Sequence, residues 1–363
     1  MRHERTLRWP SSANGDLCRR IILMNSNGKI GVALLSFAHV HAKGYADNIS
    51  ANPDCETVVI WDEDAYRGQS EADKRDLPYN EHLDQVLANP EVEAVVVNAP
   101  TANHYDLLIQ SAKAGKHIFT EKSLTITASE AIEVIRAVED AGIKFMISLP
   151  SRTRPEILFA KRVLDQGLLG EVTQMRARIA HMAALDRWFS DGSAWFGDEA
   201  LAGGGAFFDL GCHRVDVMRW FLGEPASVVA QMTNFSGNYQ VDDSMAAIVT
   251  FRNKAIGILD VSWVHRHGPN PLEIYGTEGY LGIDASPSGP KIQLISNRVT
   301  TGEIQGCIAP SNLPAALPSP MQQWISAIKD GTSTTITIYD GYNLVQLLEG
   351  CYTAARQGHE VTF

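Results

Sequence analysis

The sequence predicts an α/β protein of two domains: a doubly wound parallel sheet, followed by an α+β domain built on an open, largely antiparallel sheet. Three observations lead to this fold class. The chain has 363 residues, more than a single hydrophobic core normally holds. Short apolar runs alternate with segments of helical spacing up to residue 149. Beyond residue 150, long strand-like runs follow one another across short turns, which is typical of antiparallel pairing.

In the first domain each expected strand is short, apolar and followed by helical spacing, as parallel strands require. The expected strands lie at residues 29–33, 57–61, 94–98, 118–119 and 144–147. The expected helices lie at residues 40–48, 81–87, 105–114 and 129–141. Gly115 follows the third of these helices directly and is a good residue to end it.

The second domain is expected to begin with a helix at residues 156–166 and to continue mainly in strands. These are predicted at residues 171–179, 227–235, 245–251, 255–263, 272–275 and 291–296. Four prolines between residues 309 and 320 indicate a loop or surface arm. We place the domains at residues 28–149 and 150–363, with residues 1–27 as a mobile extension. Met24 leaves open a start of translation later than Met1.

Composition excludes several classes of partner. The net charge of −11 and a pI near 5.5 argue against nucleic acid and anionic membranes, which need clustered basic residues. No apolar run approaches the roughly 20 residues that span a bilayer. The five cysteines form no C-x-x-C pair, so we expect neither a disulfide framework nor a zinc site, and a cytoplasmic location.

The stretch 203–216 carries the clearest chemistry. Three glycines precede Asp209 and His213, whose spacing places both on one face of a helix, while the glycines would let a ligand approach the backbone. Alone, this spacing also fits a helix cap and a buried structural histidine. Lys122 follows a buried strand, where it would meet the same cleft. An ammonium, a carboxylate and an imidazole converging there would make a proton-transfer site.

Together with these motifs, residues 99–104, 114–122, 339–341 and 354–358 resemble the family of glucose-fructose oxidoreductase, inositol dehydrogenase and their MocA-like relatives. The resemblance implies an N-terminal Rossmann domain that binds a nicotinamide cofactor and a C-terminal domain for substrate binding and oligomerisation. It also implies an NAD(P)-dependent dehydrogenase that acts on a carbinol carbon of a sugar, cyclitol or related polyol. A homodimer or homotetramer is expected. The alternative is an inactive protein of the same fold that senses a sugar or nucleotide.

The resemblance assigns roles to individual residues. Lys122 matches the lysine that contacts nicotinamide and substrate, and Asp209 and His213 match the rest of the catalytic set. In this interpretation His213 takes the hydroxyl proton, Lys122 stabilises the developing alkoxide, and Asp209 positions the hydroxyl. The cofactor-binding candidates elsewhere are the acid near the nicotinamide ribose and the turn along the cofactor, namely Glu121, Pro100, Asn103 and His104.

The family's Gly-x-Gly-x-x-Gly turn is absent. Depending on the alignment, Ala33, Leu35 and Ala38 or Leu34, Ser36 and His39 take the glycine places. A leucine there should push the phosphates outward or reshape the loop, although helix N-terminal amides could still bind them. We therefore expect cofactor contacts at residues 36–38, that is, Ser36, Phe37 and Ala38.

Asp62 ends the second strand, where a carboxylate binds the adenosine ribose. The neighbouring Glu63 and Asp64 favour NAD over NADP, and Arg67 is the counter-argument. Ser123 stands in place of the family's proline after Lys122.

Arg152 fits a substrate contact or a contact between the domains, and Trp188 and Trp195 each fit a sugar contact or core packing. Of these, Arg152 and Trp195 are the substrate-binding candidates. No metal is expected, because the pairs His39-x-His41 and His265-x-His267 lack a third ligand.

Overall fold

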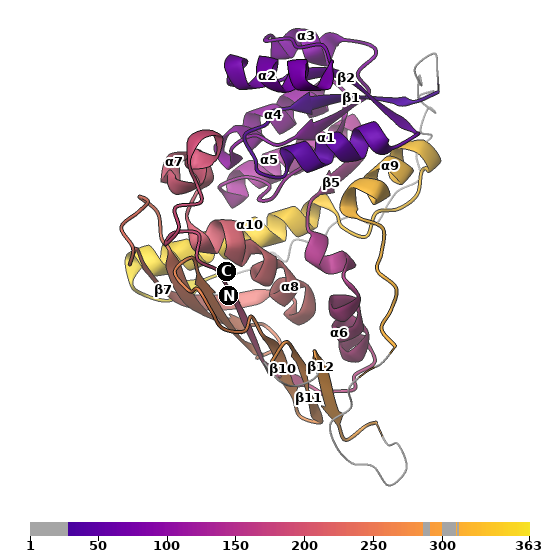
Figure 1. Ribbon diagram of the computed structural model, residues 1–363. Helices are drawn as coiled ribbons and strands as arrows, with labels where there is room; N and C mark the ends of the chain where they lie inside the picture. The colour runs from indigo at the N-terminus through magenta and orange to yellow at the C-terminus, as the bar shows by residue number, and fades with distance from the viewer. Residues whose placement is uncertain (1–27, 286–290, 300–309, 311) are drawn as a thin grey trace, which may run out of the picture.

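The computed structural model describes residues 28–285, 291–299, 310 and 312–363 (Figure 1). The expected extension at residues 1–27 lies outside these described residues. Two sheets organise the chain, one of five strands and one of eight. Within the described ranges, no helix combines the length and the apolar character needed to cross a membrane.

The first sheet is parallel, with strand order β2-β1-β3-β4-β5, as the alternating pattern predicts. Its strands are β1 (Ile30–Leu35), β2 (Cys55–Trp61), β3 (Ala94–Val97), β4 (His117–Thr120) and β5 (Phe145–Ile147). The four helices expected in this half are α1 (Ala42–Ala51), α3 (Leu83–Ala88), α4 (Thr101–Lys113) and α5 (Ala128–Ala141). The helix expected at the start of the second half is α6 (Pro155–Asp165). Strands β1 and β3 are buried throughout, because helices cover both faces of the sheet.

One helix of this half is not apparent from the sequence pattern. Helix α2 (Ala65–Arg75) is strongly polar, and of its side chains only Glu71 and Ala72 are buried. Its start is fixed instead by Asp64, whose carboxylate accepts the amide of Arg67. Gly68 packs against Tyr79, so a helix without an apolar stripe still docks on the sheet.

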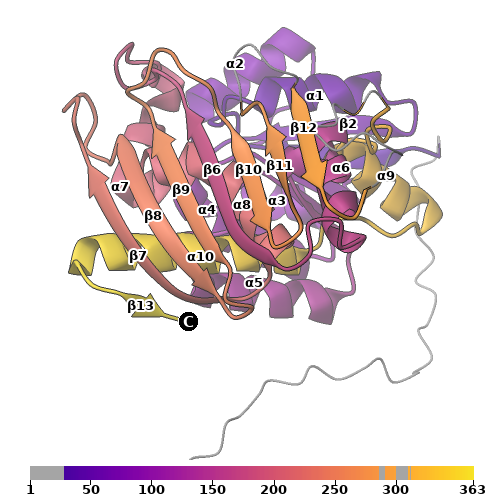
Figure 2. The same ribbon diagram turned by 90° about the horizontal axis from the view of Figure 1, so that it is seen from below.

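The second sheet has the order β12-β11-β10-β6-β9-β8-β7-β13. Its strands are β6 (Val172–Ala180), β7 (Pro225–Thr233), β8 (Ser244–Phe251), β9 (Ile256–Ser262), β10 (Leu272–Gly276), β11 (Gly279–Ile283), β12 (Ile292–Ser296) and β13 (Val361–Thr362). All pairs are antiparallel except β6 with β9, which run parallel. Helices lie behind this sheet in Figure 2, and no helix of the described residues covers its other face.

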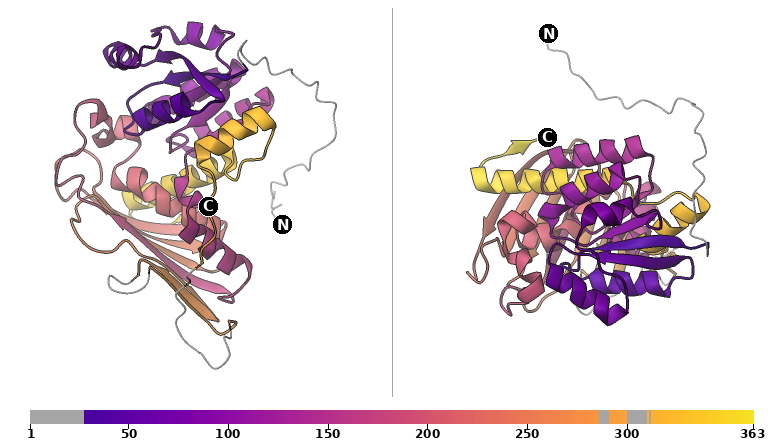
Figure 3. Two further views of the ribbon diagram at one scale, coloured as in Figure 1. Left: turned by 45° about the vertical axis from the view of Figure 1, so that its right-hand side comes forward. Right: turned by 90° about the horizontal axis from the view of Figure 1, so that it is seen from above.

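The last two helices return to the first sheet. Helix α9 (Pro320–Asp330) contacts β4 and β5, and α10 (Ile338–Gln357) contacts both α5 and β7 (Figures 1 and 3). The C-terminal segment therefore holds the two sheets together. We retain the boundary between residues 149 and 150 as a proposal.

The glycine run before Asp209 serves packing. Gly203 ends helix α7 (Glu199–Ala202) with a φ of 85°, which favours glycine. A Cβ on Gly204 would lie 2.3 Å from the Tyr352 hydroxyl, and one on Gly205 would lie 1.9 Å from the carbonyl oxygen of Asp242. The expectation that a ligand approaches these glycines is therefore wrong for Gly205, because the backbone of Asp242 fills the space beside it.

Replacing Gly205 with alanine should lower the free energy of unfolding by about 2–3 kcal/mol, because the new methyl group overlaps backbone that cannot move aside. Gly44→Ala is the matched control. A Cβ on Gly44 meets nothing within 4 Å, so this change should stabilise α1 by about 0.5–1 kcal/mol. Urea unfolding of both variants measures the difference, and equal stabilities would show that the glycine run tolerates side chains.

Candidate active site

A buried ion pair joins the two halves of the chain. Lys122 follows β4 and is 6% exposed. Its Nζ donates to the Oδ1 atom of Asp209 at 2.7 Å and to the backbone oxygen of the same residue at 2.8 Å. The peptide bond between Lys122 and Ser123 is cis. The structure thus brings together two of the three predicted catalytic residues.

Asp209 lies in a π-helical turn, Phe207–Gly211, that leads directly into helix α8 (Cys212–Leu222). The sequence spacing predicts one regular helix through Asp209 and His213, and this part of the prediction is wrong. The carbonyl oxygen of Asp209 accepts hydrogen bonds from Lys122 and from the Cys212 thiol. Such wide turns are frequent at functional sites, because they redirect backbone groups that a regular helix would use internally.

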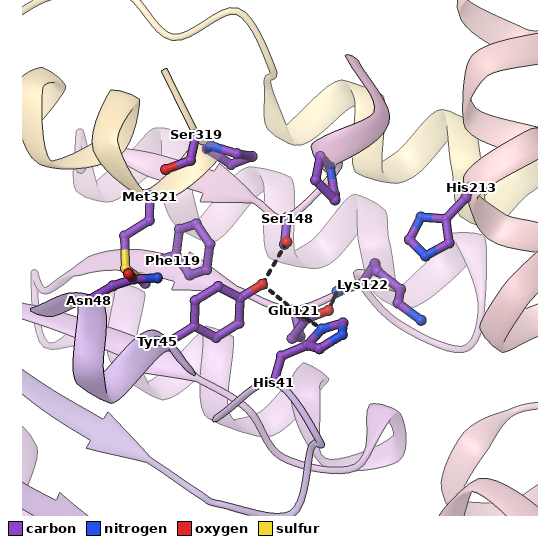
Figure 4. Close-up of a pocket in the computed structure, with 12 residues that line it drawn as sticks. His41, Tyr45, Asn48, Phe119, Glu121, Lys122, Ser148, His213, Ser319 and Met321 are labelled. Atoms are coloured by element: carbon purple, nitrogen blue, oxygen red, sulfur yellow. Dashed lines mark hydrogen bonds and ion pairs between the residues drawn. The ribbon is translucent and has the colours of Figure 1, made fainter. Parts of the chain in front are cut away.

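His213, in the first turn of α8, lines a cavity of about 150 Å³ together with Lys122, Glu121 and His41 (Figure 4). The rest of the wall is Tyr45, Asn48, Phe119, Ser148, Pro150, Ser319, Pro320 and Met321. A second, smaller cavity lies against Lys122 and Asp209 and is lined by Thr101, Ser123, Trp195, Phe196, Ala202, Gly204 and Phe208. Lys122 therefore borders both cavities: His213 lines the first together with it, and Asp209 lines the second.

Burial and charge set the protonation states of this trio. Burial opposes the charged form of Lys122, but the Asp209 carboxylate outweighs it and raises the pKa of the ammonium. Burial likewise opposes ionisation of Asp209, but Lys122 outweighs it and lowers the pKa of the carboxyl group. Burial, reinforced by the positive charge of Lys122, lowers the pKa of His213 to about 4. At neutral pH the site holds an ammonium, a carboxylate and an uncharged imidazole.

Glu121 forms a second buried anchor beside the trio. Its carboxylate accepts hydrogen bonds from the His41 ring at 2.9 Å, from the Tyr45 hydroxyl and from the amide of Lys122 at 3.0 Å. Burial opposes its ionisation, but the imidazoles of His39 and His41 and the Lys122 ammonium lower its pKa. The Tyr45 hydroxyl also forms a hydrogen bond with the hydroxyl of Ser148, the residue that follows β5. This network fixes the backbone from which Lys122 projects.

His39, His41 and Glu121 hold three potential metal ligand atoms within 4.8 Å of one another. The Nδ1 atom of His39, however, accepts the backbone amide of His41 at 3.2 Å, which places the ring proton on Nε2. A protonated Nε2 does not bind a metal; this one is buried, lies 3.7 Å from Glu121 and has no hydrogen-bond partner among the described residues. The absence of a metal remains a prediction.

The turn after β1 is enclosed. Ser36 adopts a φ of 73°, the conformation that glycine adopts freely, and Ser36, Phe37 and Ala38 are all buried. The backbone amides of this turn already donate hydrogen bonds to other protein groups. The amide of Phe37 donates to the Asp62 carboxylate, that of Ala38 to the Ser36 hydroxyl, and that of His39 to the carbonyl oxygen of Asn98. The structure therefore does not bring the three predicted phosphate contacts to the surface of the cleft.

Backbone amides without an acceptor occur a few residues further along the chain, at the start of α1. Lys43 and Gly44 lie in the first turn of α1, and their amides donate to no acceptor within the described residues. Such amides, together with the helix dipole, attract phosphate. The start of α1 thus fits phosphates that are displaced outward, as a leucine-containing turn implies.

Asp62 is also engaged. It is 3% exposed, and its carboxylate accepts the amide of Phe37 and two guanidinium hydrogen bonds from Arg67, at 2.9 and 2.6 Å. Arg67 also pairs with Glu63 at 2.7 Å. Binding of a ribose hydroxyl by Asp62 therefore requires sharing with Arg67, and this role remains a proposal.

The other candidates have mainly structural contacts. Pro100 and Asn103 lie at the start of α4, while His104 is buried with its ring nitrogens 2.8 Å from the carbonyl oxygen of Ser123 and 3.1 Å from that of Ala99. Arg152 is buried in ion pairs with Asp216 and Asp340. Its guanidinium also lies over the Trp220 ring.

Trp195 lines the smaller cavity and is 7% exposed. Its indole N–H donates to the carbonyl oxygen of Ala38 at 3.0 Å, and its ring stacks on Phe196. The side chain thus ties the second half of the chain to the turn after β1.

Sequence reasoning missed Tyr45 and Ser148, and it did not assign His41 to the site. One signal was available: Tyr45 follows His41 by four residues, a spacing that brings two side chains to the same side at the start of a helix. Ser148 carries no such signal, because its role depends on a hydrogen bond with Tyr45, 103 residues away in the sequence.

Comparisons with known proteins agree with this architecture. A family model described as "Oxidoreductase family, NAD-binding Rossmann fold" matches residues 30–149, and one described as "GFO/IDH/MocA C-terminal domain" matches residues 157–282. Levoglucosan dehydrogenase of Pseudarthrobacter phenanthrenivorans is 27% identical over 54% of this chain and 56% of its own length. Inositol 2-dehydrogenase of Rhizobium meliloti is 25% identical over 89% and 95%. The crystal structure of GenD2 from gentamicin A biosynthesis, in complex with NAD, superposes with a TM-score of 0.76 at 26% identity, over 92% of this chain and 96% of that one.

The electrostatics of the trio can be tested by titration. We expect His213 to stay uncharged down to a pH of about 4, because burial and Lys122 both disfavour its cation. Lys122→Met should raise the pKa of His213, and Asp209→Asn should lower it further. NMR titration of protein labelled at histidine measures these shifts, with His213→Asn identifying the resonance. An ordinary pKa that neither substitution moves would contradict the described site.

Proposed function

The chain belongs to the GFO/IDH/MocA oxidoreductase family, and we propose that it transfers a hydride between a nicotinamide cofactor and a carbinol carbon of a sugar, cyclitol or related polyol. One observation carries the proposal: Lys122 bonds Asp209 across the two halves of the chain, and His213 lines the same cavity as Lys122. The names of the levoglucosan and inositol dehydrogenases among its relatives support this class of substrate.

The three side chains divide the work at the alcohol. Uncharged His213 accepts the hydroxyl proton, since its lowered pKa keeps a lone pair free at neutral pH. Lys122 donates a hydrogen bond to the same oxygen and stabilises the negative charge that develops there. Asp209 keeps Lys122 charged and fixes its direction. In the opposite direction, protonated His213 returns the proton to the oxygen.

The residues present fit a nicotinamide dinucleotide in part. Glu121, Lys122 and Thr101 border the two cavities at the carboxyl edge of the parallel sheet, where such a fold binds its ligand. The exposed amides of Lys43 and Gly44 replace the enclosed turn as the phosphate-binding groups. When bound, the cofactor supplies the hydride acceptor or donor.

One observation favours the alternative, an inactive protein of the same fold that senses a sugar or nucleotide. The amides of Phe37, Ala38 and His39 are all taken by protein acceptors, and Trp195 covers the turn. A protein that only senses a sugar has no need of an open dinucleotide site. The charged pair Lys122–Asp209 favours the enzyme, because a buried ion pair is costly to keep without a reaction.

We also propose self-association and a reducing compartment. The open face of the larger sheet carries exposed apolar side chains, among which Val229 lies directly opposite Ile248, with Ile256 and Ile295 further along. An apolar face of this kind suits a homodimer or homotetramer. Cys55, Cys212 and Cys351 are free and buried, which supports a location in the cytoplasm.

The catalytic assignment predicts the following result. In a screen of sugars and inositols with NAD, Lys122→Met and His213→Asn should each lower kcat/KM by at least about a hundredfold, the lower end of typical acid–base contributions. Lys74→Met and His82→Asn are controls, because both side chains are more than half exposed and line neither cavity. Unchanged turnover in Lys122→Met, or no binding of either dinucleotide at millimolar concentration, would refute the enzyme.

Cofactor choice gives an independent prediction. NADH should bind at least about tenfold more tightly than NADPH, because a 2′-phosphate would meet Asp62, Glu63 and Asp64 while Arg67 is already paired. Isothermal titration calorimetry compares the two directly. Tighter binding of NADPH would mean that Arg67 leaves Asp62 to bind the phosphate.

A further inference from the structure

Arg152 is fully engaged by protein groups beside the larger cavity. It is 4% exposed and follows Pro150, which lines that cavity, by two residues. Its Nε atom donates to both carboxylate oxygens of Asp216, at 3.1 and 3.0 Å, and its Nη2 atom donates to Oδ1 at 2.7 Å. Its Nη1 atom donates to Asp340 at 2.7 Å. The Trp220 ring covers the guanidinium, with 5.0 Å between ring centroid and central carbon.

The ion pair between Arg152 and Asp216 connects two segments that line the same cavity. Asp216 lies on α8, three residues after His213, and the turn Pro150–Thr153 contacts this helix. Pro150 and His213 are both part of the cavity wall, and His213 projects from α8 in Figure 4. Each partner of the ion pair is thus within one helical turn of a lining residue. The position of α8 relative to the end of β5 therefore depends on this contact.

The contact resists separation for electrostatic and geometric reasons. Burial opposes the charge of Arg152, but the carboxylates of Asp216 and Asp340 outweigh it and raise the pKa of the guanidinium. A buried charge that loses its partner is costly, so movement of α8 away from Arg152 is strongly disfavoured. The planar guanidinium also binds a carboxylate with two parallel donors, which fixes the direction of the contact as well as its length.

We propose that Arg152 is a positioning residue, whose ion pair with Asp216 holds α8 against the segment after β5 and thereby keeps His213 in a narrow cavity beside Lys122. The proposal deepens the function proposed above and rests on it. Of the two roles that the sequence leaves open for Arg152, it selects the contact between the two halves. An error of about 1 Å in the placement of a reacting group can cost about a hundredfold in rate, so this contact matters for turnover.

The pKa of His213 reports directly on the ion pair. Burial is the main reason that this pKa is lowered to about 4. Arg152→Met should raise it toward the ordinary 6.5, because water enters the cavity once the two segments separate. Arg152→Lys keeps the charge but loses the planar fork, so it should give a smaller rise, and it replaces Arg152→Met if that variant does not fold. NMR titration of protein labelled at histidine measures both shifts.

Arg219 offers a matched control on the same helix. It is also 4% exposed, pairs with Glu224 at 2.7 Å, and donates to Asn343 and Gln346 of α10 at 3.1 and 3.3 Å. It lines neither cavity. Arg219→Met should therefore lower the midpoint of urea unfolding, as the Arg152 variants do, and leave the pKa of His213 unchanged. A purely structural role of Arg152 predicts no difference between the two positions.

Turnover gives the second measurement, with NAD and the sugar or inositol that wild-type protein oxidises fastest. Arg152→Lys should lower kcat at least about tenfold and leave the Kd for NADH within about threefold, whereas Arg219→Met should leave both within about threefold. Wild-type protein that oxidises no probe would refute the dehydrogenase, and the titration would still decide the role of Arg152. A His213 pKa that neither Arg152 variant moves, or that Arg219→Met raises equally, would overturn the proposal and leave the roles of Lys122 and His213 intact.

Discussion

The contact between the Lys122 ammonium and the Asp209 carboxylate constrains the whole molecule. An ammonium that is 6% exposed is costly unless an anion and further acceptors surround it. Here the anion comes from the other half of the chain, 87 residues away, and the same residue adds its backbone oxygen. The end of β4 and the turn before α8 must therefore meet closely, and the packing around each serves that meeting.

Each side of the contact has its own support. On the first sheet, Glu121 gathers His41, Tyr45 and the amide of Lys122 into one buried network. On the other side, Asp242 accepts the amides of Gly205 and Phe207, and Tyr352 bonds Asp242. The glycine run is needed because Tyr352 and Asp242 pass so close to it. Two polar networks, one in each half, thus hold the Lys122 ammonium and the Asp209 carboxylate in contact.

The turn after β1 lacks the family's glycines, and protein groups fill the space beside it. These two features are connected. Without glycines, phosphate cannot approach the backbone of residues 36–38, and the structure fills that position with Asp62, Ser36 and Trp195. The start of α1 remains exposed beside His41. Under the proposed function, the chain therefore keeps the three predicted catalytic residues and alters the turn that would bind phosphate.

Much of this could be predicted from the sequence. Alternating apolar runs give the parallel sheet, and the family resemblance carried by residues 114–122 and 203–216 implies that Lys122, Asp209 and His213 share one cleft. The polar helix α2 gives no periodic signal. The π-helical turn, the pairing of Arg67 with Asp62, and the bond from Trp195 to Ala38 depend on side-chain packing between distant segments, which residue spacing does not encode.

Isotope transfer tests the central claim most directly. The protein is incubated with NADH deuterated at C4 and with a keto-inositol, and the product is analysed by NMR. The account predicts deuterium on the new carbinol carbon with wild-type protein and none with Lys122→Met. A keto-inositol that wild-type protein leaves unlabelled, despite bound NADH, would contradict a hydride-transfer site built around Lys122 and Asp209.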